Sequence, residues 1–174
     1  MEGVILDPAT RLDRIETARL VLRRATLQDL PAFHAAMRDP HAMRYWSTPP
    51  HDDIEQTRQW LTGMIEADAA TSDDFVIELD GAAIGKLGAW HLPEIGFLIH
   101  PDQQGQGYGA EALTAFIAYI RSRGLPCLKA DVDPRNAACL ALLRRAGFIG
   151  TGSAEKTWLV GDEWCDSIYM GLEL

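Results

Sequence analysis

A glycine-rich stretch, QQGQGYGA at residues 103–110, holds the residue types and the spacing that point most directly to chemistry. Its glycines stand at alternate positions: Gly105, Gly107 and Gly109. Glycine lets the backbone turn tightly and approach a ligand closely. Because an apolar run at residues 95–99 precedes the stretch and a helical pattern follows it, backbone N–H groups and a helix N-terminus would converge on one point. Such a point attracts an anion, most often a phosphate.

The spacing of the glycines separates this stretch from two common phosphate-binding motifs. The dinucleotide fingerprint is G-x-G-x-x-G, and here the third glycine comes one residue too early. The nucleoside triphosphate loop ends in Gly-Lys-Ser/Thr, which the stretch lacks. A nicotinamide-dependent oxidoreductase is therefore disfavoured, and the pattern that fits is Gln-x-x-Gly-x-Gly at Gln104, Gly107 and Gly109. Taken alone, the stretch could also be an ordinary glycine-rich turn before a helix.

Composition indicates the class of protein. The chain has 174 residues, of which 47% are apolar, so we expect a single domain over residues 1–174 with a loose lead-in at residues 1–16. A net charge of −9 argues against a nucleic-acid partner, and it is compatible with a cationic partner such as an amine. No apolar run approaches the ~20 residues of a membrane span, so no membrane partner is expected.

The three cysteines are far apart, at positions 127, 139 and 165, and no Cys/His group has the spacing of a metal site. We therefore expect no metal. The thiols are interpreted as free, in a reducing cytoplasm. The first residues of the chain are mixed and charged, unlike a signal peptide.

The elements that position these residues follow from hydrophobic periodicity. Alternation and short apolar runs predict strands at residues 19–23, 75–79, 82–87, 94–100, 128–132, 156–160 and 165–172. Apolar residues at helical spacing predict helices at about 26–38, 52–65, 110–123 and 137–146. Strands and helices alternate in the middle of the chain, with hairpins on either side, which indicates an α+β domain built on a mixed sheet.

A second motif follows the glycine loop at a fixed distance. NAAC at residues 136–139 leads to AGF at residues 146–148, and together with the loop this resembles the GNAT family of N-acetyltransferases, which bind acetyl-coenzyme A (acetyl-CoA). TARLVLR at residues 17–23 and WCD at residues 164–166 look like the RimJ/RimL-type branch, which acetylates N-terminal amines of ribosomal proteins. The resemblance spans about residues 17–172.

The resemblance implies a GNAT acyl-CoA N-acyltransferase fold. This is a mixed, mostly antiparallel sheet with helices on both faces, splayed between the fourth and fifth strands. Acetyl-CoA would be the co-substrate, and its pantetheine arm would fill the gap between the strands. Backbone contacts with that arm are implied at Phe97, Leu98 and Ile99. Pyrophosphate contacts are implied at Gln104, Gly105, Gln106, Gly107, Tyr108 and Gly109. Asn136 would support the arm, and the helix that carries Cys139 would line it.

The resemblance also implies that an amine attacks the thioester directly in a ternary complex, which needs a base and a donor to the developing oxyanion. Glu94, at the start of the central strand, is the first choice for the base. Asp131, on the neighbouring strand, is the second. Each could instead be a solvated carboxylate, because exposed carboxylates are common. A backbone N–H near Phe97 would stabilise the oxyanion.

The acid that protonates the leaving thiolate is where the sequence departs from the family. Many members carry a tyrosine seven residues after the asparagine, and Leu143 stands there. Cys139, in place of the usual serine of the branch, could donate the proton, because a thiol pKa of ~8.5 matches a thiolate leaving group. The alternative for Cys139 is a small buried residue, in which case solvent supplies the proton.

The acceptor implied by this chemistry is a primary amine, either a protein N-terminus or a small molecule such as a polyamine or an aminoglycoside. Tyr45 and Trp46 are candidate walls of its pocket, and Asp166 and Tyr169 are weaker candidates. The chain would act as a monomer or a homodimer. The competing hypothesis is a non-catalytic acyl-CoA-binding module that acts as a sensor.

Overall fold

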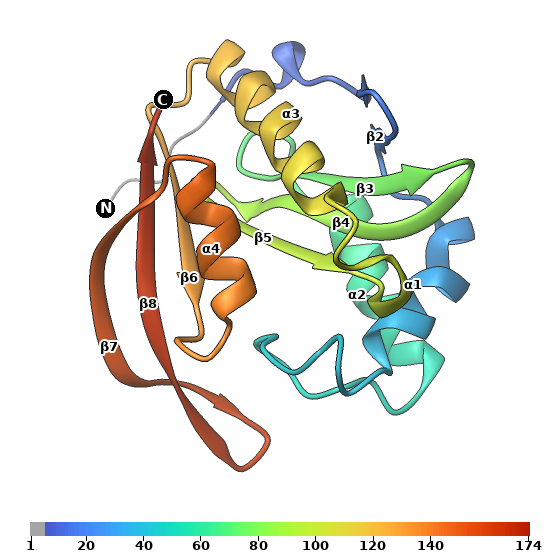
Figure 1. Cartoon of the computed structure of the whole chain (residues 1–174). Helices are drawn as coiled ribbons and strands as arrows, with labels where there is room; N and C mark the ends of the chain where they lie inside the picture. Colours follow the sequence, from blue (N-terminus) through green and yellow to red (C-terminus); the bar gives the residue numbers. More distant parts are fainter. Residues whose placement is uncertain (1–5) are drawn as a thin grey trace.

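The computed structural model describes residues 6–174 as one eight-stranded sheet with helices packed against it (Figure 1). The strands are β1 (Arg14–Glu16), β2 (Val21–Arg23), β3 (Asp73–Leu79), β4 (Ala82–His91), β5 (Glu94–Ile99), β6 (Cys127–Val132), β7 (Ile149–Val160) and β8 (Glu163–Glu173). The helices are α1 (Leu30–Met37), α2 (Ile54–Glu66), α3 (Tyr108–Ser122) and α4 (Ala137–Arg145). The strand order is β1-β2-β3-β4-β5-β6-β8-β7, and among the strands of residues 6–174 only β5 and β6 pair in parallel. The expected α+β fold with a mixed, mostly antiparallel sheet is confirmed.

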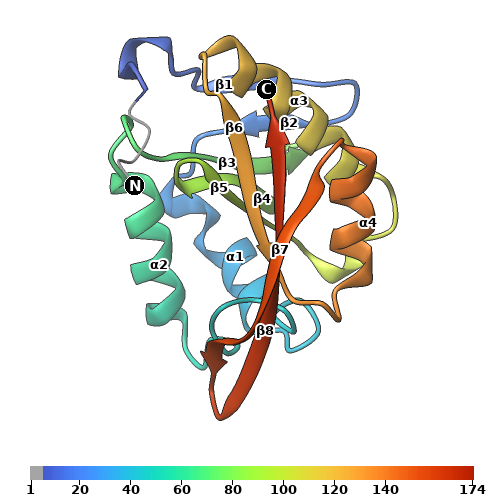
Figure 2. The same ribbon diagram turned by 90° about the vertical axis from the view of Figure 1, so that its left-hand side faces the viewer.

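The two faces of the sheet build separate cores, because side chains alternate along each strand. On β3, Phe75 and Ile77 are buried in the core that α3 and α4 complete, and Val76 between them is buried against α1 and α2. Figure 2 shows these two pairs of helices on opposite sides of the sheet. Layers on both faces fix the central strands, from which the site residues project.

The neighbouring strands β5 and β6 diverge after a single register pair. Their register pairing joins Glu94 to Lys129, and the Lys129 N–H donates a 2.9 Å hydrogen bond to the Pro93 carbonyl. Within residues 6–174 no other register pair joins these two strands. The splay expected between the strands that end at Ile99 and Val132 is thereby confirmed. These are the fifth and sixth strands, because β1 adds one to the count.

The lead-in that was expected to be loose is partly ordered. Residues 8–10 form a short 3-10 turn, and β1 pairs with β2 in antiparallel register. β1 has only three residues, Arg-Ile-Glu, which is too short to produce a periodic signal in the sequence. The first part of the expected lead-in, residues 1–5, lies outside the described residues.

A buried carboxylate holds the N-terminal segment in place. Asp73 of β3 is 0% exposed, and it accepts 2.8 Å hydrogen bonds from Arg24 and from the Tyr119 hydroxyl, together with a third from Arg123. Arg123 also donates to the Asp7 carbonyl at 2.8 Å. These hydrogen bonds join the N-terminal segment, β3 and the end of α3. The contacts must be kept, because a buried carboxylate is stable only when it is paired.

The lengths of the elements differ from expectation in two main places. α3 begins at Tyr108 rather than Ala110, because Gly107 has a φ of 85° and is the N-cap of the helix. β7 begins at Ile149 rather than near residue 156, because it is an edge strand whose mostly exposed side chains need not alternate. No helix in the described part of the chain combines the length and the apolar character that crossing a membrane requires.

Candidate active site

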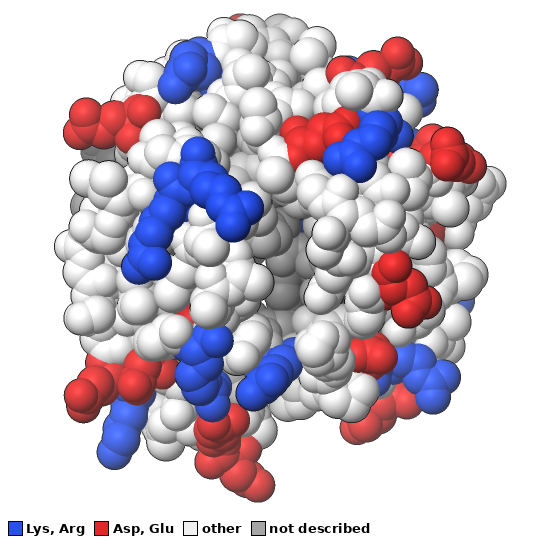
Figure 3. Space-filling model, in the orientation of Figure 1, with Lys and Arg blue, Asp and Glu red and all other residues white. Residues whose placement is uncertain are grey.

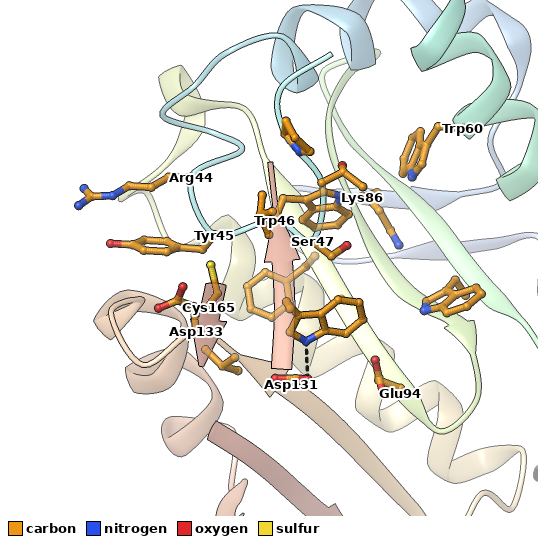
Figure 4. Close-up of a pocket in the computed structure, with 18 of the residues that line it drawn as sticks. Arg44, Tyr45, Trp46, Ser47, Trp60, Lys86, Glu94, Asp131, Asp133 and Cys165 are labelled. Atoms are coloured by element: carbon orange, nitrogen blue, oxygen red, sulfur yellow. Dashed lines mark hydrogen bonds between the residues drawn. The ribbon is translucent and has the colours of Figure 1, made fainter. Parts of the chain in front are cut away.

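A cavity of about 1000 Å³ lies beside the opening between β5 and β6. Its walls come from the loop between α1 and α2, from α2, from β3, β4, β5 and β6, from the start of α4 and from the β7–β8 hairpin. Figure 3 shows the molecule hollowed beside α4, and Figure 4 shows side chains from these elements facing one another across the cavity. Among residues 6–174, no three His, Cys, Asp or Glu side chains are arranged to hold a metal ion.

The glycine loop follows the other end of β5 and does not line the cavity. Gly105 and Gly107 have φ angles of 76° and 85°, which suit glycine and strain other residues. Since Gly107 is the N-cap of α3, the free N–H groups of the first helical turn face the loop. The Gln104 amide donates a 2.9 Å hydrogen bond to the Ile99 carbonyl and ties the loop to the end of β5.

Arg19 braces the same loop from the side of β2. Its Nη1 donates to the Gln106 carbonyl at 3.0 Å, and its Nε donates to the Glu111 carboxylate at 2.7 Å. Its guanidinium also lies 4.6 Å from the centre of the Tyr108 ring. The shape of the loop is therefore fixed by contacts within the protein, as preorganised binding of an anion would require.

The direction of the β5 backbone decides which residues face the opening toward β6. The His100 N–H donates to β4 at 2.8 Å, and backbone groups alternate in direction along a strand. The backbone N–H and carbonyl of Leu98 accordingly point to β4. The Leu98 carbonyl oxygen lies so close to Gly85 of β4 that a Cβ added to that glycine would be 2.1 Å from it. Phe97 and Ile99 face the opening. Of the three residues expected to contact pantetheine through the backbone, these two are suitably directed and Leu98 is not.

Glu94 and Asp131, the two candidate bases, both line the cavity from the facing strands β5 and β6 (Figure 4). Partial burial raises the pKa of Glu94, and the negative charge of Asp131 raises it further. The charges of His91 and Lys129 act in the opposite direction but do not cancel these effects. Glu94 is therefore a more basic carboxylate than an ordinary glutamate.

Asp131 is held in place rather than free in solvent. Its carboxylate accepts a 2.8 Å hydrogen bond from the indole N–H of Trp158 on β7, marked by the dashed line in Figure 4. The register of β7 against β8 shifts between Ala154 and Trp158. This irregularity lies just before the residue that reaches across β8 to β6, and bulges commonly redirect side chains in this way.

Asn136 and Cys139 line the cavity at the start of α4. The Asn136 side chain is the helix N-cap, because its oxygen accepts a 3.1 Å hydrogen bond from the Cys139 N–H. Its NH2 group is not used by the cap. Burial raises the pKa of the Cys139 thiol to about 12, so this thiol is a weak acid.

Most of the residues expected to wall the acceptor site line this cavity. Tyr45, Trp46 and Asp166 line the cavity, while Tyr169 does not. Of the residues expected to contact the cofactor, the glycine loop, Leu98 and Ile99 also lie outside the cavity. The cavity is therefore distinct from the glycine loop, and the two are connected along β5.

Among the residues that line the cavity and were not expected there from the sequence are three tryptophans, Trp60, Trp90 and Trp158, and the charged residues Lys86 and Asp74. The Lys86 ammonium lies 2.6 Å from the Asp74 carboxylate. The sequence did contain a signal for this pair, because a lysine stands inside the apolar run of β4. A lysine is almost never buried unless an acidic partner pairs with it.

The comparisons with known proteins agree with this architecture. Residues 19–149 match the family described as acetyltransferase (GNAT) domain. The L-methionine sulfoximine/L-methionine sulfone acetyltransferase of Pseudomonas paraeruginosa is 28% identical over 169 residues, covering 88% of this chain and 94% of that protein.

Two solved structures show the same fold at low identity. The apo form of the ribosomal alpha-N-protein acetyltransferase RimL has a TM-score of 0.84 at 20% identity, with 99% of this chain and 100% of that chain covered. The spermidine N-acetyltransferase from Vibrio cholerae, in complex with CoA and spermine, has a TM-score of 0.77 at 19% identity, with 90% and 96% covered. The family match extends over most of the chain, and this chain is accordingly an N-acetyltransferase of the GNAT family.

Proposed function

We propose that this enzyme transfers the acetyl group of acetyl-CoA to a primary amine, by direct attack within a ternary complex. The observation that carries the proposal is that the cavity and the β5–β6 opening share residues. Phe97 lines the cavity and its backbone faces the opening, and Asn136 and Cys139 line the cavity from the start of α4, which follows β6. An amine in the cavity and a thioester in the opening would therefore lie side by side, which favours reaction by proximity.

The residues of this chain fit CoA along the length of β5. The glycine loop and the first turn of α3 offer N–H groups to a pyrophosphate. The backbone of Phe97 faces the opening and is available to pantetheine amides. At Ile99 only the N–H is available, because the carbonyl is bonded to Gln104. The Asn136 NH2 group would reach the same arm from α4. When bound, acetyl-CoA would supply the activated acyl group.

Glu94 is the proposed base. A carboxylate with a raised pKa takes a proton from an ammonium more readily, either directly or through one water. Asp131, fixed by Trp158, would hold the positive charge of the incoming amine rather than act as the base. The Phe97 N–H would donate to the acetyl oxygen as negative charge develops on it.

The proton for the leaving thiolate is proposed to come from solvent. A thiol whose pKa is about 12 is a weaker acid than an ordinary thiol of pKa ~8.5. Transfer of a proton from Cys139 to a CoA thiolate would therefore be uphill. We assign Cys139 to the wall of the pantetheine site instead, where its small side chain leaves room for the arm.

The acceptor amine is suggested only in outline by the relatives. Their names describe a methionine derivative, a protein N-terminus and spermidine as acceptors. A primary amine is common to all three. A place in the RimJ/RimL-type branch and a cytoplasmic setting belong to the same proposal, and the free cysteines are compatible with a reducing compartment.

Binding and turnover of the purified chain test the proposal. Calorimetry should show heat with acetyl-CoA and none with NAD. A thiol-release assay over N-terminal peptides, polyamines and aminoglycosides should show turnover that Glu94→Gln lowers by about 10²–10⁴-fold, with acetyl-CoA affinity retained. Glu155→Gln, on the exposed part of β7 outside the cavity, is the matched control. Binding without any turnover would favour the sensor hypothesis, and no heat with acetyl-CoA would refute the proposal.

A further inference from the structure

The proposed acceptor cavity has aromatic walls on several sides. Trp46 comes from the loop before α2, Trp60 from α2, Trp90 from β4 and Trp158 from β7. Trp90 and Trp158 remain 69% and 42% exposed, so they are accessible to a ligand. The faces of tryptophan rings attract cations, and their large surfaces pack against apolar groups. These walls suit an ammonium group carried on an apolar body.

Glu94 and Asp131, the carboxylates between these walls, form no ion pair within residues 6–174, although the charges of His91 and Lys129 partly offset the rise in the pKa of Glu94. Asp131 is bonded to the uncharged indole N–H of Trp158. A positive charge that enters the cavity would meet both carboxylates, and a negative charge would be repelled by both.

Lys86 lines the cavity, yet its charge is already engaged. Its ammonium lies 2.6 Å from the carboxylate of Asp74, and the two side chains are only 5% and 4% exposed. Asp74 cannot easily move, because its carboxylate packs closely against Gly88. If residue 88 carried a Cβ, that atom would lie only 2.7 Å from Oδ1 of Asp74. Drawing Lys86 toward a substrate carboxylate would leave Asp74 as an unpaired buried charge, which is strongly unfavourable.

His51 also lines the cavity, and burial lowers the pKa of its imidazole, which favours the neutral ring. Arg44 is the other lysine or arginine that lines the cavity within the described part of the chain. Its guanidinium lies 5.2 Å from the centre of the Tyr45 ring. Figure 4 shows it directed away from the cavity, and the residue is exposed. Neither Lys86 nor Arg44 is therefore placed to receive a carboxylate that sits next to the reacting amine.

We infer that the cavity accepts primary amines with no carboxylate beside the reacting nitrogen, and that it disfavours free amino acids. The inference rests on the proposed function and adds the class of acceptor. A free amino acid would bring its carboxylate toward Glu94 and Asp131 with no available cation, and such like-charge contacts strongly oppose binding. The acceptor preference would then differ from that of the Pseudomonas paraeruginosa relative, whose name describes amino-acid derivatives as acceptors.

Two matched pairs of amines test the inference with the wild-type enzyme. They are L-methionine with L-methioninamide, and L-tryptophan with tryptamine. Amidation lowers the pKa of the amine and decarboxylation raises it, so a preference seen in both pairs reflects the carboxylate and not the protonation of the nucleophile. We expect kcat/KM from thiol release to be about tenfold or more higher for methioninamide and tryptamine. Equal or higher values for the free amino acids would overturn the inference and leave acetyl transfer standing.

A binding measurement separates failure of the inference from failure of the proposed function. Quenching of the cavity tryptophans, followed with CoA present, reports binding of L-methionine and L-methioninamide without turnover. If no amine is acetylated, the proposed function fails, but the titration still decides the preference. Tighter binding of methioninamide supports the inference, and equal binding overturns it.

A variant of the buried pair provides a second test. Asp74→Asn removes the partner of the Lys86 charge, so L-methionine should gain in kcat/KM relative to L-methioninamide, by several-fold. A melting curve checks that the variant is folded. If the folded variant shows the same ratio as the wild-type enzyme, the role given to the Lys86–Asp74 pair is wrong.

Discussion

The indole N–H of Trp158 donates a 2.8 Å hydrogen bond to the carboxylate of Asp131, 27 residues earlier in the sequence. The bond reaches from β7 past β8 to β6. It holds the carboxylate at the cavity beside Glu94, and it sets the indole ring along the cavity wall. The β7–β8 hairpin therefore contributes a wall of the cavity in addition to forming one edge of the sheet.

Trp158→Phe should weaken acceptor binding while leaving the chemical step nearly intact. The substitution keeps an aromatic ring and removes the N–H, so Asp131 loses the bond that fixes it. For a partly exposed side chain we expect a loss of about 1 kcal/mol, which corresponds to a rise in KM for the amine of roughly fivefold with little change in kcat. Trp164→Phe is the control, since Trp164 is 54% exposed and does not line the cavity. Equal effects of the two substitutions would contradict this role of Trp158.

The activity should fall on the acid side with the titration of Glu94. Burial and the charge of Asp131 raise its pKa above the ordinary 4.5, and the base must be ionised to act. Asp131→Asn removes the second of these causes, so the pKa of Glu94 should fall and the acid limb of kcat/KM should move to lower pH. The wild-type enzyme and the variant are assayed with the same amine, so that the protonation of the substrate affects both pH profiles equally. NMR titration of the labelled Glu94 carboxyl gives the same shift directly, and a limb that moves to higher pH would contradict the interpretation.

Local chemistry explains which parts of the site could be predicted from the sequence. The glycine loop was found because positive φ angles at Gly105 and Gly107 require that residue type. Asn136 was predicted as a helix cap from its sequence signature, and its place at the cofactor was implied by the family resemblance. Glu94 was found because it opens a strand with clear apolar alternation. Each of these signals lies within a few residues of the feature that it predicts.

The parts that could not be predicted depend on contacts between distant segments. The bond between Trp158 and Asp131 requires the β7–β8 hairpin to pair beside β6 with a shifted register. The pair formed by Lys86 and Asp74 requires β3 and β4 to align. The direction of the Leu98 backbone follows from the register of β4 against β5, and one residue of shift would reverse it. Periodicity in one segment contains none of this information.

Gly107→Ala should weaken CoA binding beyond its effect on stability. A left-handed φ of 85° costs other residues about 1–2 kcal/mol, and a Cβ would lie 3.4 Å from Nη2 of Arg19. The loop can escape this strain only by changing its shape, so we expect the Kd for CoA to rise by about tenfold, measured by calorimetry. Gly124→Ala is the matched control, because Gly124 follows the other end of α3 with a φ of 79° and open space around it.

Both glycine variants should lower the melting temperature by similar amounts, because they introduce the same backbone strain. Only Gly107→Ala should change the affinity for CoA. If Gly124→Ala weakened CoA binding equally, the effect would be one of general stability, and the assignment of the loop to the pyrophosphate would lose its support.

Cys139→Ala should leave the rate of acetyl transfer nearly unchanged. Burial raises the pKa of the thiol to about 12, so it holds its proton more tightly than a leaving thiolate attracts one. We expect kcat within roughly threefold of the wild-type value, against the 10²–10⁴-fold loss typical of removing a general acid. The KM for acetyl-CoA reports separately on the change in the wall of the pantetheine site. Cys139→Ser distinguishes the two roles, since its hydroxyl can occupy the same space and donate a proton. A loss of about 100-fold in the alanine variant that serine restores would make residue 139 the acid after all, and protonation by solvent would then be wrong.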